Sequence, residues 1–126
     1  AEFGHGVFPD GLIFDREGGI WITSIVSNRV IRLTESGSQS VIIEDFDPEH
    51  LDWVEQAFLK GEMGRPHLDK TPSKKLKNIS SLAFGGADLQ TAYLGCLLDD
   101  CIYRFEAPFK GIPPVHWNFE GPKRNV

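Results

Sequence analysis

Two stretches of the chain, DGLIFDREGGIWITSIVSNRVIRL at residues 10–33 and SSLAFGGADLQTAYLGCLLDDCIYRF at residues 80–105, follow the same pattern. The aligned pairs are Leu12 with Leu82 and Phe14 with Phe84 at an offset of 70 residues, then Trp21 with Tyr93, Ile22 with Leu94, Val30 with Ile102 and Arg32 with Arg104 at an offset of 72. The offset changes in the first turn, where GADLQT is longer than REGG. Because turns tolerate length changes better than the elements they connect, the pattern indicates an internal duplication.

Each copy has the pattern of short strands separated by sharp turns. Apolar runs alternate with Gly, Asn, Asp and Ser turn residues, which favours antiparallel hairpins. We expect strands at residues 12–15, 20–25, 30–33 and 40–44 in the first copy, and at 82–84, 92–97, 101–105 and 115–119 in the second. Units of about 40 residues with four such strands are typical of propeller blades. The predicted fold is therefore all-β, with two four-stranded antiparallel β-propeller blades at residues 11–44 and 78–119.

The segment between the two copies, residues 45–77, predicts one short helical insertion. Asp47 is a suitable N-cap, Pro48 suits the first helical position, and apolar residues follow at helical spacing. We expect a helix at about residues 48–60, followed by a loop. The whole chain, residues 1–126, then forms a single partial propeller domain.

Composition excludes several classes of function. The 126 residues carry a formal net charge of -5, which argues against a nucleic-acid binder. The one basic stretch, KTPSKKLKN at residues 70–78, is either a solvated loop or a weak attractor of anions. No apolar run approaches the roughly 20 residues of a membrane span, so we expect no membrane partner.

The cysteines and histidines show no metal-binding spacing. Cys96 and Cys101 flank a predicted turn and fit no zinc pattern, and the four histidines are scattered. The two thiols are either free in a reducing compartment or joined across the hairpin. A cytoplasmic location is the default expectation for free thiols.

Three segments resemble a known family. FPDGLIFDREGGIWITSIVSNRVIRL, ISSLAFGGADLQTAYLGCLL and KGIPPVHW are similar to the last two blades and the closing segment of the senescence marker protein, gluconolactonase and luciferin-regenerating enzyme family. Members of that family form six-bladed propellers with a divalent metal, usually calcium, at the mouth of the central channel, and many hydrolyse lactones. The resemblance implies a gluconolactonase-like, metal-dependent lactone hydrolase.

The resemblance gives Asp10 a specific role. The aspartate of PDG is a metal ligand in the family, which implies that Asp10 is both the metal ligand and the catalytic carboxylate here. A hard cation such as calcium prefers oxygen ligands and polarises a lactone carbonyl or activates a water. The residues alone leave another interpretation open, because Pro-Asp-Gly is also a common turn sequence. Asp15 and Glu17 have no such counterpart and are expected to be turn residues.

The chain departs from the family in what it lacks. It matches only two blades, and the family's other ligands, a glutamate near the N-terminus and an asparagine from the middle blades, have no counterpart here. One carboxylate does not hold calcium, which takes about six to eight oxygen ligands. Asn78, Ser80 and Ser81 enter the second copy at positions where residues lining the channel would lie, and they are equally suitable as loop and capping residues.

Three interpretations of the chain follow. It is an inactive C-terminal piece of a larger lactonase-like enzyme, a small protein that self-associates, or a non-catalytic β-propeller-like binding or assembly module. Two blades leave apolar faces and strand edges uncovered, and closed rotational symmetry covers all of them at once. We therefore expect a homo-oligomer, most simply a trimer with three Asp10 side chains near its axis and a small lactone as substrate.

Overall fold

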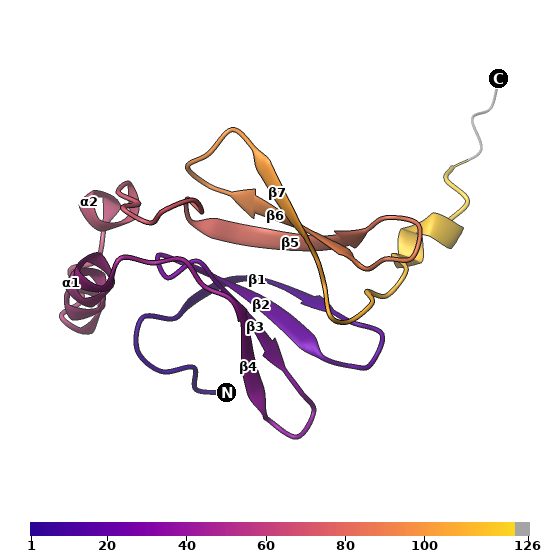
Figure 1. Cartoon of the computed structure of the whole chain (residues 1–126), viewed down its shortest axis with the longest axis horizontal. Helices are drawn as coiled ribbons and strands as arrows, with labels where there is room; N and C mark the ends of the chain where they lie inside the picture. Colours follow the sequence, from indigo (N-terminus) through magenta and orange to yellow (C-terminus); the bar gives the residue numbers. More distant parts are fainter. Residues whose placement is uncertain (123–126) are drawn as a thin grey trace.

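Two antiparallel sheets make up most of the molecule, and little of it is helical (Figure 1). The structure is a computed structural model and describes residues 1–122. The N-terminal sheet contains β1 (Phe8–Phe14), β2 (Ile20–Ile25), β3 (Arg29–Leu33) and β4 (Gln39–Ile43) in that order. The C-terminal sheet contains β5 (Ile79–Gly85), β6 (Thr91–Cys96) and β7 (Ile102–Glu106). The mostly β fold and the two antiparallel sheets match the expectation from the duplicated pattern.

Within residues 1–122 the C-terminal sheet has three strands, so the prediction of a second four-stranded sheet is wrong. The run predicted as its fourth strand, residues 115–119, instead contains the short 3-10 helix η1 (Val115–Asn118). The chain after β7 turns across the end of the sheet, where the Ala107 N–H donates to the Gln90 carbonyl and the Gly111 N–H donates to the Leu89 carbonyl. These bonds carry the chain away from β7, so the tail lies beyond the ends of the strands (Figure 1).

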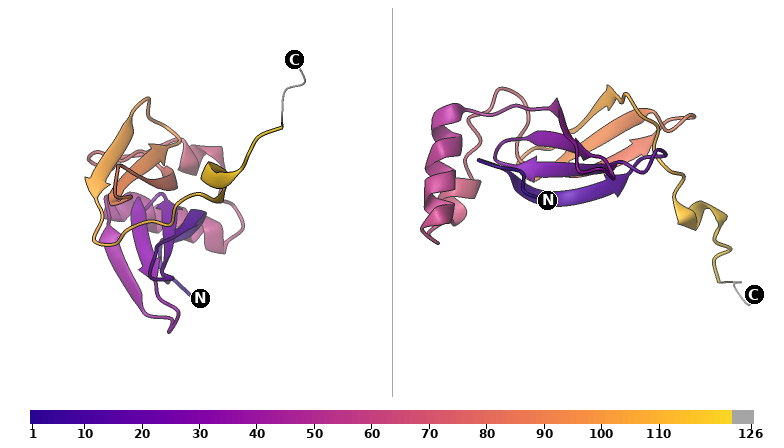
Figure 2. Two further views of the ribbon diagram at one scale, coloured as in Figure 1. Left: turned by 90° about the vertical axis from the view of Figure 1, so that its right-hand side faces the viewer. Right: turned by 90° about the horizontal axis from the view of Figure 1, so that it is seen from below.

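The insertion contains the predicted helix and one further short helix. In α1 (Pro48–Leu59), the Asp47 side chain accepts the His50 N–H at 2.8 Å, as expected for an N-cap. The second helix, α2 (Arg65–Leu68), was not predicted. Both helices lie at one end of the sheets (Figures 1 and 2), where Leu51 and Val54 of α1 pack with Phe8 and Val26. Among the described residues, no helix is both long and apolar enough to cross a membrane.

The main core lies between the two sheets. Trp21 of β2 is fully buried, and its ring meets that of Phe84 of β5 edge-on, with the centroids 5.1 Å apart. Val30, Ala92 and Leu94 complete the centre of this core. The sheets contact through β1 and β2 against β5, and they diverge toward β4 and β7 (Figure 1). The two sheets therefore form a wedge that is closed at β1 and β5 and open at the outer strands.

Asp15, at the end of β1, joins four parts of the fold. Its fully buried carboxylate accepts hydrogen bonds from Arg32 Nε at 2.6 Å and Trp21 Nε1 at 2.8 Å. It also accepts the backbone N–H groups of Gly19 and Glu17, which confirms its expected role in the turn. The Asp15 backbone bridges to Gly111, so the segment that follows β7 is fixed to the end of β1.

We predict that Asp15→Ala lowers the free energy of unfolding by about 3–5 kcal/mol, because it leaves the largely buried guanidinium of Arg32 with only the exposed carboxylate of Glu17, 3.9 Å away, as an ionic partner. Glu17→Ala, at a side chain that is 67% exposed in the same turn, is the matched control and should change stability by no more than about 0.5 kcal/mol. Urea denaturation of both variants measures the difference. Equal losses in the two variants would contradict the assigned role.

The buried carboxylate of Asp15 makes the free energy of unfolding depend on pH. Burial alone would raise the pKa of Asp15, but the hydrogen bonds from Arg32, Trp21 and the turn outweigh it and lower the pKa below its usual value. The folded-state pKa thus lies below the unfolded value of about 3.9. The contribution of Asp15 to stability is therefore complete above about pH 4 and is lost as the pH falls through the folded-state pKa. Denaturation curves between pH 7 and pH 2 should show a larger loss of stability in the wild type than in Asp15→Ala, which keeps all the other titrating carboxylates.

Candidate functional site

Asp10 lies in a β-bulge near the start of β1. Pro9 pairs with Ser24 and Leu12 pairs with Ile22, so Asp10 and Gly11 together face the single residue Thr23 of β2. The Thr23 hydroxyl accepts the Gly11 N–H at 3.0 Å, which satisfies a donor that the bulge removes from the ladder. Bulges redirect side chains and are frequent next to active sites. The Asp10 side chain is exposed, and within residues 1–122 it takes part in no side-chain hydrogen bond or ion pair.

The second sheet has a bulge at the matching position. Ile79 pairs with Cys96 and Ser81 pairs with Gly95, which leaves Ser80 as the extra residue of β5. The offset of 70 residues that aligns Leu12 with Leu82 also aligns Asp10 with Ser80. The duplication therefore extends to an irregularity of the backbone. The predicted strands contain no bulge, although a glycine inside a strand is a signal for the first one.

The two bulges touch each other. A Cβ atom on Gly11 would lie 2.5 Å from the Ser80 carbonyl oxygen and 3.3 Å from Ser81 Cα. Only glycine permits this approach of β1 to β5. The structure thus brings three of the four predicted site residues to one place, with Asp10 and Ser81 exposed and Ser80 half-buried.

Asn78, the fourth predicted site residue, lies apart from this group and is buried, with 1% of its surface exposed. Its Oδ1 accepts the Val26 N–H at 2.9 Å, and its Nδ2 donates to the Leu68 carbonyl at 2.8 Å. Val26 has a φ of 67°, which is unfavourable for a β-branched residue. The Asn78 amide thus stabilises a strained turn and is not available to a ligand.

Asn28 makes the reciprocal connection from the N-terminal sheet. Its Oδ1 accepts the Ile79 N–H at 3.0 Å, while its Nδ2 donates to the carbonyls of Asp45 and Leu76. It is fully buried, like Asn78, and has a left-handed φ of 44°. Asn28 and Asn78 therefore connect the β2–β3 turn, the insertion and the start of β5, immediately behind the two bulges.

A single chain does not provide a calcium site at the bulges. Asp10 supplies one carboxylate, the amide oxygen of Asn78 is occupied, and calcium takes about six to eight oxygens. A different group, Asp99, Asp100 and Cys101 in the β6–β7 turn, has ligand atoms within 4.8 Å of one another. The Tyr103 hydroxyl donates to Asp99 at 2.6 Å and lowers its pKa to about 2. Exposed acidic groups of this kind are common without a metal, and nothing identifies calcium there.

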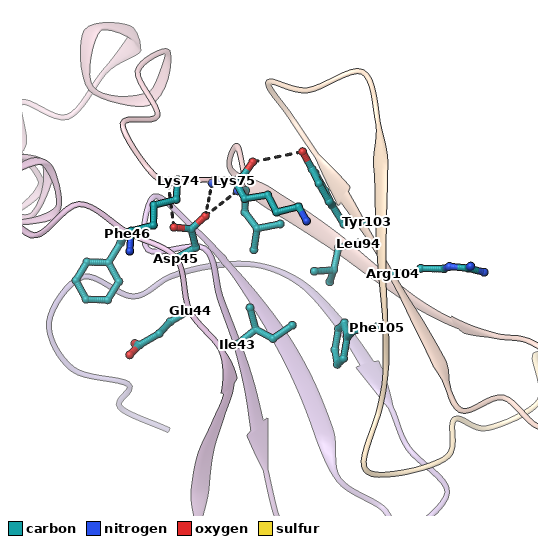
Figure 3. Close-up of a pocket in the computed structure, with 11 residues that line it drawn as sticks. Ile43, Glu44, Asp45, Phe46, Lys74, Lys75, Leu94, Tyr103, Arg104 and Phe105 are labelled. Carbon is teal, nitrogen blue, oxygen red and sulfur yellow. Dashed lines mark hydrogen bonds between the residues drawn. The ribbon is translucent and has the colours of Figure 1, made fainter.

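A cleft of about 570 Å³ opens where the sheets diverge (Figure 3). Its walls include Ile43 next to β7 residues Tyr103 and Phe105, with Leu94 behind them. Figure 3 shows the Lys75 side chain extending over this space toward Tyr103, and its ammonium lies 5.6 Å from the Tyr103 ring centre. No local sequence pattern indicates this cleft, because its walls come from strands of the two different copies and from both ends of the insertion.

Asp45 closes one end of the cleft. Its carboxylate accepts the backbone N–H groups of Lys74, Lys75 and Leu76 at 3.0, 2.7 and 2.8 Å (Figure 3). Burial would raise the pKa of Asp45, but these hydrogen bonds and the charge of Lys77 lower it. The Asp45 carboxylate thus binds the end of the insertion next to β4.

The comparisons with known proteins add no identification. No family model matches the chain, and no curated protein matches it.

We predict that Gly11→Ala lowers the free energy of unfolding by about 1–3 kcal/mol, because the added methyl group overlaps the Ser80 carbonyl oxygen and forces β1 away from β5. Gly64→Ala is the matched control, since a Cβ there meets only Pro66 Cδ at 3.9 Å. Thermal denaturation should place Gly11→Ala well below the wild type and Gly64→Ala close to it. A Gly11→Ala protein as stable as the control would contradict the close approach.

Substitutions of Asn78 and of the nearby Ser80 test whether the Asn78 side chain, and not that of Ser80, stabilises the fold. Asn78→Ala should cost about 2–4 kcal/mol, because it leaves the buried Val26 N–H without an acceptor and imposes a left-handed φ of 60° on alanine. Asn78→Gly keeps the backbone conformation and should cost less than Asn78→Ala, while Ser80→Ala should be within about 0.5 kcal/mol of the wild type. If urea denaturation gives equal values for Asn78→Ala and Ser80→Ala, the assigned role of Asn78 is wrong.

Proposed function

We propose that this chain is a two-blade unit of a lactone-hydrolase-type β-propeller, in which Asp10 is the metal-binding carboxylate. The repeated bulge is the observation that carries the proposal. It gives both sheets the same irregularity on their contacting strands, β1 and β5, and places an exposed carboxylate at the first of them. A propeller needs this arrangement, with inner strands close together around an axis and outer strands diverging from it.

The uncovered sheet faces support completion of the ring by further copies. The outward face of the N-terminal sheet carries Leu12, Phe14 and Val41, which are 67%, 48% and 55% exposed. The outward face of the C-terminal sheet carries Ile102, which is 72% exposed, and the partly exposed Tyr93. Stacking one of these faces on the other in a neighbouring copy is a head-to-tail contact, which closes into a ring when the rotation permits. Three copies would supply the six blades that the family resemblance implies.

Assembly would also supply what the single chain lacks at Asp10. A trimeric ring brings three Asp10 carboxylates toward one axis, together with the backbone and hydroxyl oxygens of the bulges. Carboxylate and carbonyl oxygens are the ligands that calcium prefers. Lactone hydrolysis is therefore a property of the assembly, and the substrate class is a small lactone.

The alternative is a non-catalytic binding or assembly module, or an inactive C-terminal fragment. The isolation of Asp10 favours it, because no second carboxylate lies in the two bulges of one chain. In this alternative the exposed apolar faces bind a protein partner, and no metal is needed. The same experiment separates the two functions.

We predict that the wild-type chain forms an oligomer that binds calcium and hydrolyses a sugar lactone such as gluconolactone, and that Asp10→Asn abolishes both properties. Asp52→Asn makes the same chemical change at an exposed position on α1 and should leave them unchanged. Calorimetric titration with calcium and a pH-stat assay of lactone hydrolysis measure the two properties. Asp99→Asn tests the other acidic group and should have no effect on either.

Retention of calcium binding and activity in Asp10→Asn would refute the assignment. Loss of calcium binding in Asp99→Asn alone would place the metal in the β6–β7 turn. An oligomer that neither binds calcium nor hydrolyses lactones would support the assembly module.

A further inference from the structure

The C-terminal sheet has a vacant position at its outer edge. In the N-terminal sheet, β4 pairs with β3, whereas β7, the counterpart of β3, has no strand on its outer side among the described residues. An open edge presents unpaired N–H and C=O groups and is a ready site for strand addition. Beside this edge, the cleft exposes the inward-facing Tyr103 and Phe105 of β7.

The C-terminal tail has the properties of the missing strand. Residues 115–119, VHWNF, alternate apolar and polar side chains with the period of a strand. Val115, Trp117 and Phe119 are 89%, 59% and 73% exposed, and the tail extends away from both sheets (Figure 2). Two backbone hydrogen bonds, from Trp117 to Pro114 and from Phe119 to His116, hold it in the 3-10 conformation. Little structure is therefore lost if this segment becomes extended.

The tail does not reach the β7 edge of its own chain. Gly111 is buried, donates to the Leu89 carbonyl and bridges to Asp15, so it is fixed on the β1 side of β5. The four steps from Gly111 to Val115 cover about 12 Å in the polyproline II conformation that Pro113 and Pro114 favour. A strand beyond β7 lies three strand spacings from β5, which is about 14 Å. The chain would also have to pass around the ends of β6 and β7.

We propose that residues 115–119 of one copy pair with β7 of a second copy as the fourth strand of its C-terminal sheet. Alternate residues of an added strand lie on the same face of the sheet as Tyr103 and Phe105. The three exposed apolar side chains of the tail therefore enter the cleft between β4 and β7, next to Ile43 and Leu94. This exchange uses a strand edge and a cleft, and it does not depend on lactone hydrolysis or on Asp10.

The test is sedimentation velocity of the full chain over a range of micromolar concentrations, combined with hydrogen exchange of residues 102–106. The wild type should associate and protect these residues. Trp117→Asp should lose this protection and sediment as a smaller species than the wild type, and because Trp117 is largely exposed, its circular dichroism should match that of the wild type. Leu59→Asp is the matched control, since Leu59 is 66% exposed on α1 and should not alter association.

A wild type that stays monomeric, or a Trp117→Asp protein that associates with β7 still protected, overturns the proposal. Leu12→Asp distinguishes tail exchange from contact between outward sheet faces. Tail exchange predicts that β7 remains protected in Leu12→Asp, and loss of that protection would assign the association to the sheet faces instead. Failure of the calcium and lactone experiments leaves this result unaffected.

Discussion

The buried carboxylate of Asp15 is the constraint on which the relative placement of the two sheets depends. Its bonds to Trp21 and Arg32 orient the ring that fills the main core and neutralise the largely buried guanidinium. Its backbone bridge to Gly111 connects the chain after β7 to the end of β1. Because both sheets are fixed to this point, β1 and β5 stay in contact and their bulges meet. The same bridge between Asp15 and Gly111 directs the C-terminal tail away from β7. One interaction therefore explains both why the two bulges meet and why the outer edge of β7 is unpaired in the part of the chain that the structure describes.

A second set of buried polar interactions, made by Asn28 and Asn78, connects the two sheets at the opposite end of the strands. Asn28 and Asn78 satisfy backbone groups in the turn, the insertion and β5, and both adopt left-handed conformations that asparagine tolerates better than most residues. Buried amides that satisfy several partners make a rigid connection, because each unmade bond would cost the full desolvation of a polar group. The bulge residues therefore lie on a rigid support, although their own side chains reach solvent.

The extent to which sequence predicts this structure differs from element to element. The duplication and the N-cap at Asp47 are local patterns, so they predict the hairpins and α1 correctly. The bonds of Asp15 to Arg32 and of Asn78 to Val26 join residues 17 and 52 positions apart, and no local pattern contains them. The error at residues 115–119 has a specific cause. The alternation of VHWNF is a true strand pattern, but the anchored segment at residues 107–111 prevents it from pairing within its own sheet.

Native mass spectrometry of the wild-type chain in the presence of calcium is the most direct test of the proposed assembly, because one spectrum gives the number of chains and the number of bound ions together. Under the proposed function, we expect a closed trimer that retains one calcium ion for its three Asp10 carboxylates and loses that ion on addition of a chelator. A monomer that binds no calcium, or one that binds one ion per chain, would contradict the claim that the site forms only by assembly.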